Sequence, residues 1–413
     1  MKFVTDIWRS TGRCDPMVSG STPTRLRRCG LIGAGTISAL CLAAQWNIDG
    51  NRRIDFRIYH RAISSMGEGG LYGYGEGILR FTYPPVTAAV FWPFTLLDES
   101  VAAHWWLVVS VTAFVAAYAL AFRHAGGPIA PAPGGVLAGA ATALWTVPAA
   151  ASLRFGQISP LLTLLICVDM AVIGRRSRWG GVLSGVAAAL RVTPLAAVPI
   201  LLASRRRDGW RCVATFVAIS TTAAIVSPAT TRQFARRLFD GAAARGGHSV
   251  DLRTILRAVV PGNGLADVVW LVASAALVIA GARRARRLPD AGGRPDGVGL
   301  LTIGACLSYV ISPLSWVHHL TLAVVALVLW ATRASARWHC AMVLVGLFGL
   351  LDPSAGESLF AQVTLVAFGI ATVVALPDAI KPDAVGPDAV AHDAAGEKGD
   401  RADLAASTGR ASA

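Results

Sequence analysis

Long apolar runs repeat along almost the whole chain, and they limit what it can fold into more than any other feature. The first run covers residues 30–46, and later runs occupy residues 83–97, 101–122, 135–151, 157–174, 179–204, 208–228, 264–282, 298–315, 316–332, 338–352 and 357–376. Only 15% of the residues are charged, against about 25% in a soluble domain. Because a spanning helix needs about 20 apolar residues, we expect an all-α polytopic membrane protein with about 10 to 12 transmembrane helices. A soluble multidomain enzyme is excluded.

The net charge of +14 would suggest a nucleic-acid partner in a soluble protein. Here the arginines cluster at the ends of apolar runs, at 175–178, 205–207, 283–287 and 333–337. Basic residues beside spanning helices mark the cytoplasmic side. We therefore assign the charge to topology and the bilayer, and expect no nucleic-acid partner.

The same reasoning divides the chain into three regions. Residues 1–28 are polar and end in arginines, so they form a cytoplasmic segment before an uncleaved anchor. Residues 29–376 form the transmembrane domain, with external loops at 47–82 and 229–263. Residues 377–413 repeat a Pro-Asp-Ala unit and form a disordered cytoplasmic tail. The protein is then a multi-pass plasma-membrane protein.

Two runs carry prolines that indicate broken helices. Residues 179–204 have arginines at both ends and contain Arg191-Val192-Thr193-Pro194, which predicts two half-helices meeting at a break. Residues 83–97 begin with two prolines and form either a span or a re-entrant helix. Broken helices at membrane depth line a buried or water-filled cavity.

Asp55 lies just beyond the first apolar run, in the first external loop. A carboxylate there can take a proton from a hydroxyl group of a lipid-borne substrate. Alternatively, Asp55 pairs with Arg57 or Arg61.

Three further candidates are ionisable groups near membrane depth. Arg191 lies in the predicted break, where an anion such as a lipid phosphate is a natural counter-charge; alternatively it snorkels or pairs with Asp169. His318 and His319 can bind phosphate or shuttle protons, or form an interfacial hydrogen-bonded pair. Since neighbouring helical residues point about 100° apart, only one of the two histidines reaches a given cavity.

Two weaker signals lie on the same predicted outer side. Gln157, at the start of a run, can hydrogen-bond sugar hydroxyls or cap its neighbours. The loop 229–263 is basic and either contacts anionic lipid head groups or forms an ordinary amphipathic surface helix. Its basic residues are Arg232, Arg236, Arg237, Arg245, His248, Arg253 and Arg257.

Motifs for nucleotides and metals are absent from the sequence. It holds no GxxxxGK[ST] loop, no strand-associated GxGxxG, no obvious DxD and no CxxC pair among seven single cysteines. We expect no nucleotide donor, no metal site, no cofactor and no disulfide framework.

Five stretches, taken in order, resemble the DUF2029 or GT87 family of actinobacterial polyprenyl-phosphate-mannose-dependent mannosyltransferases. They are IDFRIYHRA (54–62), FTYPP (81–85), FGQISPLLTLL (155–165), GGVLSGVAAALRVTPL (180–195) and SPLSWVHHLTL (312–322). The resemblance implies a GT-C fold and an inverting transfer of mannose from polyprenyl-phosphate mannose to a phosphatidylinositol mannoside or lipomannan-type glycolipid on the external face.

The resemblance also implies roles for individual residues. Asp55 would be the general base, and Arg191, which replaces the family's usual lysine, would bind the donor phosphate together with His318 or His319. Residues that would contact the sugar or the acceptor are Tyr59, Tyr83, Gln157 and Trp316. Two alternatives stay open: a decaprenyl-phosphate-arabinose-dependent arabinofuranosyltransferase, and a transporter or flippase of lipid-linked sugars.

Overall fold

A computed structural model describes most of the apolar part of the chain. It covers residues 22–46, 53–66, 70–74, 80–125, 133–173, 177–241, 249–288, 296–333, 337–354 and 357–378. Most of the predicted N-terminal segment, and all but Pro377 and Asp378 of the predicted tail, lie outside these residues. Within them every regular element is a helix, as predicted for an all-α membrane protein.

Three described helices are long and apolar enough to cross a membrane: α6 (Glu99–Arg123), α12 (Arg206–Val226) and α15 (Asn263–Arg287). The count becomes four if one bent pair is taken as a span, so the expected 10 to 12 spans are not confirmed. Several other runs form helices below 18 residues. Their bounds are α9 (Ser159–Ile173), α16 (Gly297–Ile311), α17 (Ala323–Thr332), α18 (Arg337–Leu351) and α19 (Leu359–Ala375). The first run forms the second half of α2 (Thr22–Trp46).

The run expected at 135–151 is bent. It forms α7 (Pro133–Thr142), η4 (Ala143–Trp145) and α8 (Val147–Phe155), with an angle of 67° at the break. Pro148 lies in the first turn of α8, where its missing N–H costs no helical hydrogen bond. Inside one continuous helix from α7 to α8 the same proline would remove a hydrogen bond. The bend directs the C-terminus of α8 towards α3 (Ile54–Ser64), which it contacts.

The break predicted at Arg191 is present. α10 (Val182–Leu190) ends there, Arg191 is extended with φ −152° and ψ 126°, and η5 (Thr193–Ala197) and α11 (Val198–Ser204) follow. Side chains from other elements satisfy two backbone carbonyls at the break. Thr87 Oγ1 donates to Leu190 O at 2.7 Å, and Ser308 Oγ donates to Thr193 O at 3.1 Å. Such partners allow non-helical backbone at this depth.

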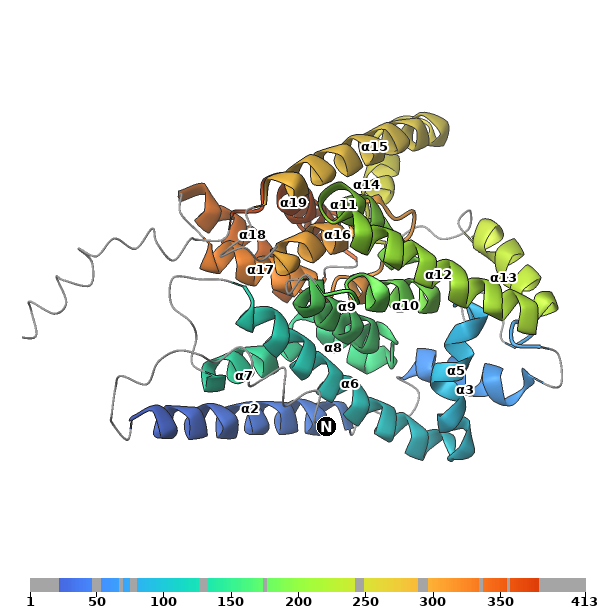
Figure 1. Ribbon diagram of the computed structural model, residues 1–413, viewed down its shortest axis with the longest axis horizontal. Coiled ribbons are helices and arrows are strands. Elements are labelled where there is room, and N and C mark those ends of the chain that lie inside the picture. The colour runs from blue at the N-terminus through green and yellow to red at the C-terminus, as the bar shows by residue number, and fades with distance from the viewer. Residues whose placement is uncertain are drawn as a thin grey trace, which may run out of the picture.

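Residues 83–97 do not form one span. They fold as η2 (Pro85–Thr87), α5 (Ala88–Phe91) and η3 (Trp92–Leu96), together shorter than the roughly 20 residues that a crossing requires. Figure 1 shows α3 and α5 at one end of the long helices, with α13 (Pro228–Gly241) beside them. α3 carries Asp55 and Tyr59, and Tyr83 lies just before η2.

The expected external loop 229–263 is largely helical. It contains α13 and the amphipathic α14 (Leu252–Val259). On α14, Arg253 and Arg257 both bind Asp267 of α15, at 2.8 and 2.7 Å. Arg245 and His248 lie outside the described residues.

Candidate active site

Asp55 lies in the first turn of α3, where the positive end of the helix dipole favours a carboxylate. The arginines two and six residues further along α3 do not neutralise it. Arg57 Nε and Arg61 Nε bind Glu99 at the start of α6, at 2.6 and 2.5 Å. The alternative in which Asp55 pairs with either arginine is therefore wrong.

Gln157 holds the Asp55 carboxylate in place. Its Nε2 donates to Asp55 Oδ2, and its Oε1 accepts from the Tyr83 hydroxyl at 2.8 Å and from the Tyr59 hydroxyl at 3.4 Å. These contacts fix the orientation of the amide, because only its nitrogen can donate to a carboxylate. Gly156 precedes Gln157 with φ +69°, and this left-handed residue ends α8 and turns Gln157 towards α3.

Burial raises the pKa of Asp55 to about 6. The loss of hydration disfavours the charged form, whereas the hydrogen bond from Gln157 and the charge of Arg191 act in the opposite direction. A carboxylate with this pKa is ionised at neutral pH and is a stronger base than an exposed aspartate. Asp55 is therefore suited to accept a proton from a hydroxyl group.

Arg191 projects from the helix break towards the same cluster. Its guanidinium contacts His319 Nε2, lies 3.4 Å from Ser159 Oγ, and stands over the Tyr83 ring at 5.5 Å from the centroid. Asp169, its expected alternative partner, instead accepts hydrogen bonds from the first turn of α10, including Gly181 N at 3.0 Å. The Arg191–Asp169 pairing is therefore wrong.

The two histidines lie in η6 (Val317–His319), the short turn before α17. His319 lines a cavity, whereas the His318 ring packs against Phe155 and Trp316, with ring centroids 5.7 Å apart in each case. Ser152 Oγ donates to the His318 carbonyl at 3.0 Å and ties the turn to α8. As predicted, only one histidine of the pair faces this cavity.

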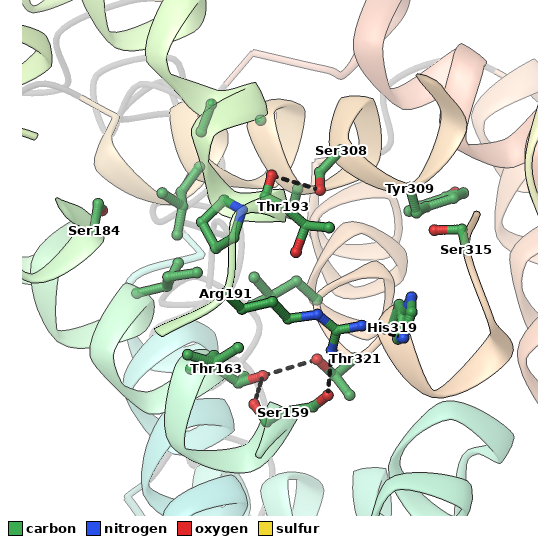
Figure 2. A pocket seen from close by; sticks show the side chains of 18 residues that line it. Ser159, Thr163, Ser184, Arg191, Thr193, Ser308, Tyr309, Ser315, His319 and Thr321 are labelled. Atoms are coloured by element: carbon green, nitrogen blue, oxygen red, sulfur yellow. Dashed lines mark hydrogen bonds between the residues drawn. The ribbon is translucent and has the colours of Figure 1, made fainter. Parts of the chain in front are cut away.

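The cavity has a volume of about 70 Å³ and lies between α9, the α10–η5 break, α16 and η6. Figure 2 shows the Arg191 guanidinium between His319 and the hydroxyl groups of Ser159 and Thr321. The N-terminus of α9 begins at Ser159. An arginine, an imidazole and a helix N-terminus together favour an anion.

The hydrogen-bond donors around the His319 ring also favour an anion. A neutral imidazole has one N–H and one acceptor nitrogen, yet both nitrogens face donors. The Trp316 backbone N–H donates to Nδ1 at 3.2 Å, and the Arg191 guanidinium faces Nε2. Because Nδ1 accepts a hydrogen bond, the ring proton is on Nε2. Two donors, this N–H and an arginine N–H, then face each other. An oxygen anion beside these two groups would accept a hydrogen bond from each.

Three residues around the site were not predicted from the sequence: Glu99, Ser249 and Asp251. Glu99 binds the two arginines of α3, and Ser249 joins the loop before α14 to the histidine segment, since its Oγ accepts from Ser315 N at 2.7 Å. Asp251, the N-cap of α14, accepts from Thr254 N at 2.8 Å. An aspartate before a short amphipathic stretch is a recognisable N-cap signal, whereas the contact with Ser315 has no local signature.

All eight predicted site residues thus form one connected cluster. They are Asp55, Tyr59, Tyr83, Gln157, Arg191, Trp316, His318 and His319. The described part of the chain holds no group of three or more acidic, histidine or cysteine side chains placed to bind a metal.

The fold and the cluster define a class of protein: a helical membrane enzyme in which a half-buried carboxylate lies in one cluster with an arginine and a histidine suited to an anion. Within this class the chain belongs to glycosyltransferase family 87, because the sequence model of that family matches residues 81–313, more than half of its length. It is therefore a glycosyltransferase. Asp55 and the histidine segment lie outside the matched residues but pack directly against them.

Named relatives come from mycobacteria. The chain is 27% identical over 304 residues, 70% of its own length and 68% of the relative's, to a polyprenol-phosphate-mannose-dependent alpha-(1-2)-phosphatidylinositol pentamannoside mannosyltransferase of Mycobacterium tuberculosis (strain CDC 1551 / Oshkosh). It is also 27% identical over 336 residues, 74% of its length and 77% of the relative's, to a polyprenol-phosphate-mannose-dependent alpha-(1-2)-phosphatidylinositol mannoside mannosyltransferase of M. tuberculosis (strain ATCC 25618 / H37Rv).

Proposed function

We propose that this glycosyltransferase transfers mannose from polyprenyl-phosphate mannose to a glycolipid of the phosphatidylinositol mannoside or lipomannan type. The names of its relatives support this donor and acceptor class. The observation that carries the chemistry is the Asp55 carboxylate, held by Gln157 and lying in one cluster with the Arg191–His319 pair.

In the proposed mechanism, Asp55 is the general base. The acceptor hydroxyl attacks the anomeric carbon of the β-linked donor while its proton moves to an Asp55 carboxylate oxygen. The bond from the anomeric carbon to the phosphate oxygen breaks in the same step, and its electron pair leaves with the polyprenyl phosphate. A single displacement inverts the configuration and yields an α-linkage.

Arg191 and His319 bind the departing phosphate. The guanidinium and the Nε2–H of His319 each donate to a phosphate oxygen, which relieves the opposition of two donors described above. Tyr59, Tyr83 and Trp316 provide aromatic walls beside the base and the arginine, and His318 supports His319 through their ring contact at 4.5 Å between centroids. Gln157 orients the base and lies within reach of a sugar hydroxyl.

The membrane arrangement is part of the proposal. We assign the chain a GT-C-type fold with 10 to 12 spans, in which several short apolar helices are broken or re-entrant. Residues 1–28 and 377–413 lie in the cytoplasm, residues 29–376 form the catalytic domain, and the Asp55 site opens on the external face of the plasma membrane.

Transfer of labelled mannose tests the assignment directly. Membranes with the wild-type chain receive radiolabelled polyprenyl-phosphate mannose and a phosphatidylinositol mannoside acceptor, and the product is assayed for label. We expect Asp55→Asn to lower the rate at least about 100-fold. Asp98→Asn is the matched control, because Asp98 is exposed and makes no capping hydrogen bond at the start of α6.

The outcomes separate the alternatives. Equal product from wild type and Asp55→Asn contradicts the catalytic assignment. If only decaprenyl-phosphate arabinose gives labelled product, the transferred sugar is arabinose and the proposed mechanism still holds. Movement of the labelled donor across the bilayer without any glycolipid product identifies a flippase.

A further inference from the structure

The three residues before α14 are buried, although they lie in a segment that the sequence predicts as an external loop. Ser249 is 1% exposed, and Val250 and Asp251 are 0% exposed. They pack against Ser315, which is also 1% exposed. Ser315 and His319 both line the cavity of the candidate active site (Figure 2). The loop before α14 therefore reaches the wall of this cavity.

Both backbone groups of Ser315 are held by this loop. The Ser315 N–H donates to Ser249 Oγ at 2.7 Å, and the Ser315 carbonyl accepts from the Val250 N–H. The same carbonyl lies 3.1 Å from Ser249 Oγ. Because the two partners are neighbours in the chain, the backbone of Ser315 cannot rotate without breaking one of these hydrogen bonds.

Asp251 orients the hydroxyl group of Ser249. A serine hydroxyl has one hydrogen and two lone pairs. Ser249 Oγ donates to the Asp251 carboxylate, the strongest acceptor beside it, and keeps a lone pair for the Ser315 N–H. Asp251 is held in turn by Thr254, whose N–H donates at 2.8 Å and whose hydroxyl donates at 3.0 Å. The first turn of α14 thus anchors the group that holds Ser315.

The peptide group between Ser315 and Trp316 carries this constraint to His319. In a planar trans peptide the carbonyl and the following N–H point in opposite directions. This peptide is trans, and its carbonyl points at Val250, so the Trp316 N–H points away from Val250. It donates to His319 Nδ1 at 3.2 Å, which places the ring proton on Nε2. The contact with Val250 therefore selects the tautomer of His319.

We infer that residues 249–251 are positioning residues for His319. They hold the peptide between Ser315 and Trp316 so that the Nε2–H of His319 stays directed at the donor phosphate. None of the three lines the cavity, so they act through this peptide and do not contact the substrate. The inference rests on the proposed function, in which the Nε2–H donates to the departing phosphate.

Steady-state transfer by the full-length protein in membranes tests this role. Ser249→Ala leaves the Ser315 N–H without its partner and lets the turn that carries His319 shift. We expect the KM for polyprenyl-phosphate mannose to rise about 3- to 10-fold, which corresponds to the loss of one hydrogen bond. The KM for the acceptor should equal that of the wild type. A smaller fraction of folded enzyme would instead lower kcat and leave both KM values unchanged.

Thr254→Val is the matched control. It removes a hydroxyl group that donates to the same Asp251 carboxylate at 3.0 Å, but it leaves Ser249 in contact with Ser315. If the segment only attached α14 to the protein, both variants would lower the melting temperature and neither would change the donor KM. We expect only Ser249→Ala to change the donor KM. A wild-type donor KM in Ser249→Ala overturns the inference.

Solid-state NMR of protein labelled with ¹⁵N-histidine reads the tautomer without any turnover. His319→Gln identifies the His319 signals among the eight histidines. We expect the wild type to carry this proton on Nε2 alone, and Ser249→Ala to show a second population with the proton on Nδ1. A single Nε2 tautomer in both proteins, or an Nδ1 proton in the wild type, contradicts the inference. A wild type that transfers no mannose refutes the proposed function, whereas the NMR comparison still decides whether Ser249 selects the tautomer.

Discussion

At the scale of single residues, the site depends on what surrounds one carboxylate. Glu99 binds Arg57 and Arg61, so Asp55 is left with Gln157 as its hydrogen-bond partner and Arg191 as the nearby charge. Burial raises the pKa of Asp55, and the other two contacts limit the rise. The balance keeps Asp55 basic yet ionised at neutral pH.

This balance predicts a pH dependence of the transfer rate. The pKa of Asp55 is about 6, so a general base at this position loses activity as the pH falls through about 6 and it becomes protonated. Replacing Arg191 by Gln removes a positive charge that lowers this pKa. The fall in rate on the acidic side of the pH–rate profile, its acidic limb, should therefore move to higher pH. The maximal rate should also be lower, because the phosphate is bound more weakly.

Initial rates between pH 4.5 and 8, measured with subsaturating donor, check the position of the limb. Asp98→Asn provides the comparison, because that exposed carboxylate lies outside the cluster and should leave the profile unchanged. A limb that stays in place after Arg191→Gln would show that Arg191 does not act on the base.

At the scale of elements, the close approach of α8 to α3 fixes the distance from Gln157 to Asp55. A Cβ on Gly156 would lie 2.6 Å from Phe56 Cβ, and its φ of +69° disfavours any other residue. We expect Gly156→Ala to destabilise the protein by about 1 to 3 kcal/mol and to lower turnover, because the strain moves α3 and its carboxylate.

Gly135→Ala is the comparison for this substitution. Gly135 lies in α7 with nothing within 4 Å of its Cβ position, so alanine there is neutral or stabilises by up to about 1 kcal/mol. Melting temperature and turnover are measured for both variants. If Gly156→Ala has the turnover of the wild type, the spacing of α3 and α8 does not position the base.

Local sequence signals predicted the helix break at Arg191 and the candidate site residues. The partners of those residues depend on long-range packing, which the sequence did not reveal. Proline chemistry located the break at Arg191, because a proline inside a helical run removes a backbone donor and disfavours helix in the residue before it. The partner of Arg191 was not accessible in this way: Asp169 was an equally reasonable neighbour until tertiary packing placed it against Gly181. The choice of His319 over His318 likewise depends on a 3₁₀ turn that no periodicity predicts.

At the scale of the whole molecule, a buried ion pair joins four helices at the end away from Asp55. Arg333, only 1% exposed after α17, binds Asp296 at 2.6 Å and also donates to the carbonyls of Ala125 and Pro377. Asp296 in turn caps α16. The pair thus connects the ends of α6, α17 and α19 with the start of α16.

Removing one partner of this pair should be costly. Arg333→Leu leaves the Asp296 carboxylate buried without its counter-charge, and we expect a loss of about 3 to 5 kcal/mol. Adding Asp296→Asn removes that charge and restores part of the stability. Melting in detergent provides the measurement. At a temperature at which the variant remains folded, its turnover should equal that of the wild type, because the Arg333–Asp296 pair lies far from Asp55.

The exposed pair Arg257–Asp267 is the control for this prediction. Both side chains are about one third exposed, 35% and 30%, so solvent screens them and Arg257→Gln should lower the melting temperature far less than Arg333→Leu does. Similar losses in Arg333→Leu and Arg257→Gln would mean that water reaches Asp296. The four helix ends would then be held by apolar packing, and the ion pair would contribute no more than a surface contact.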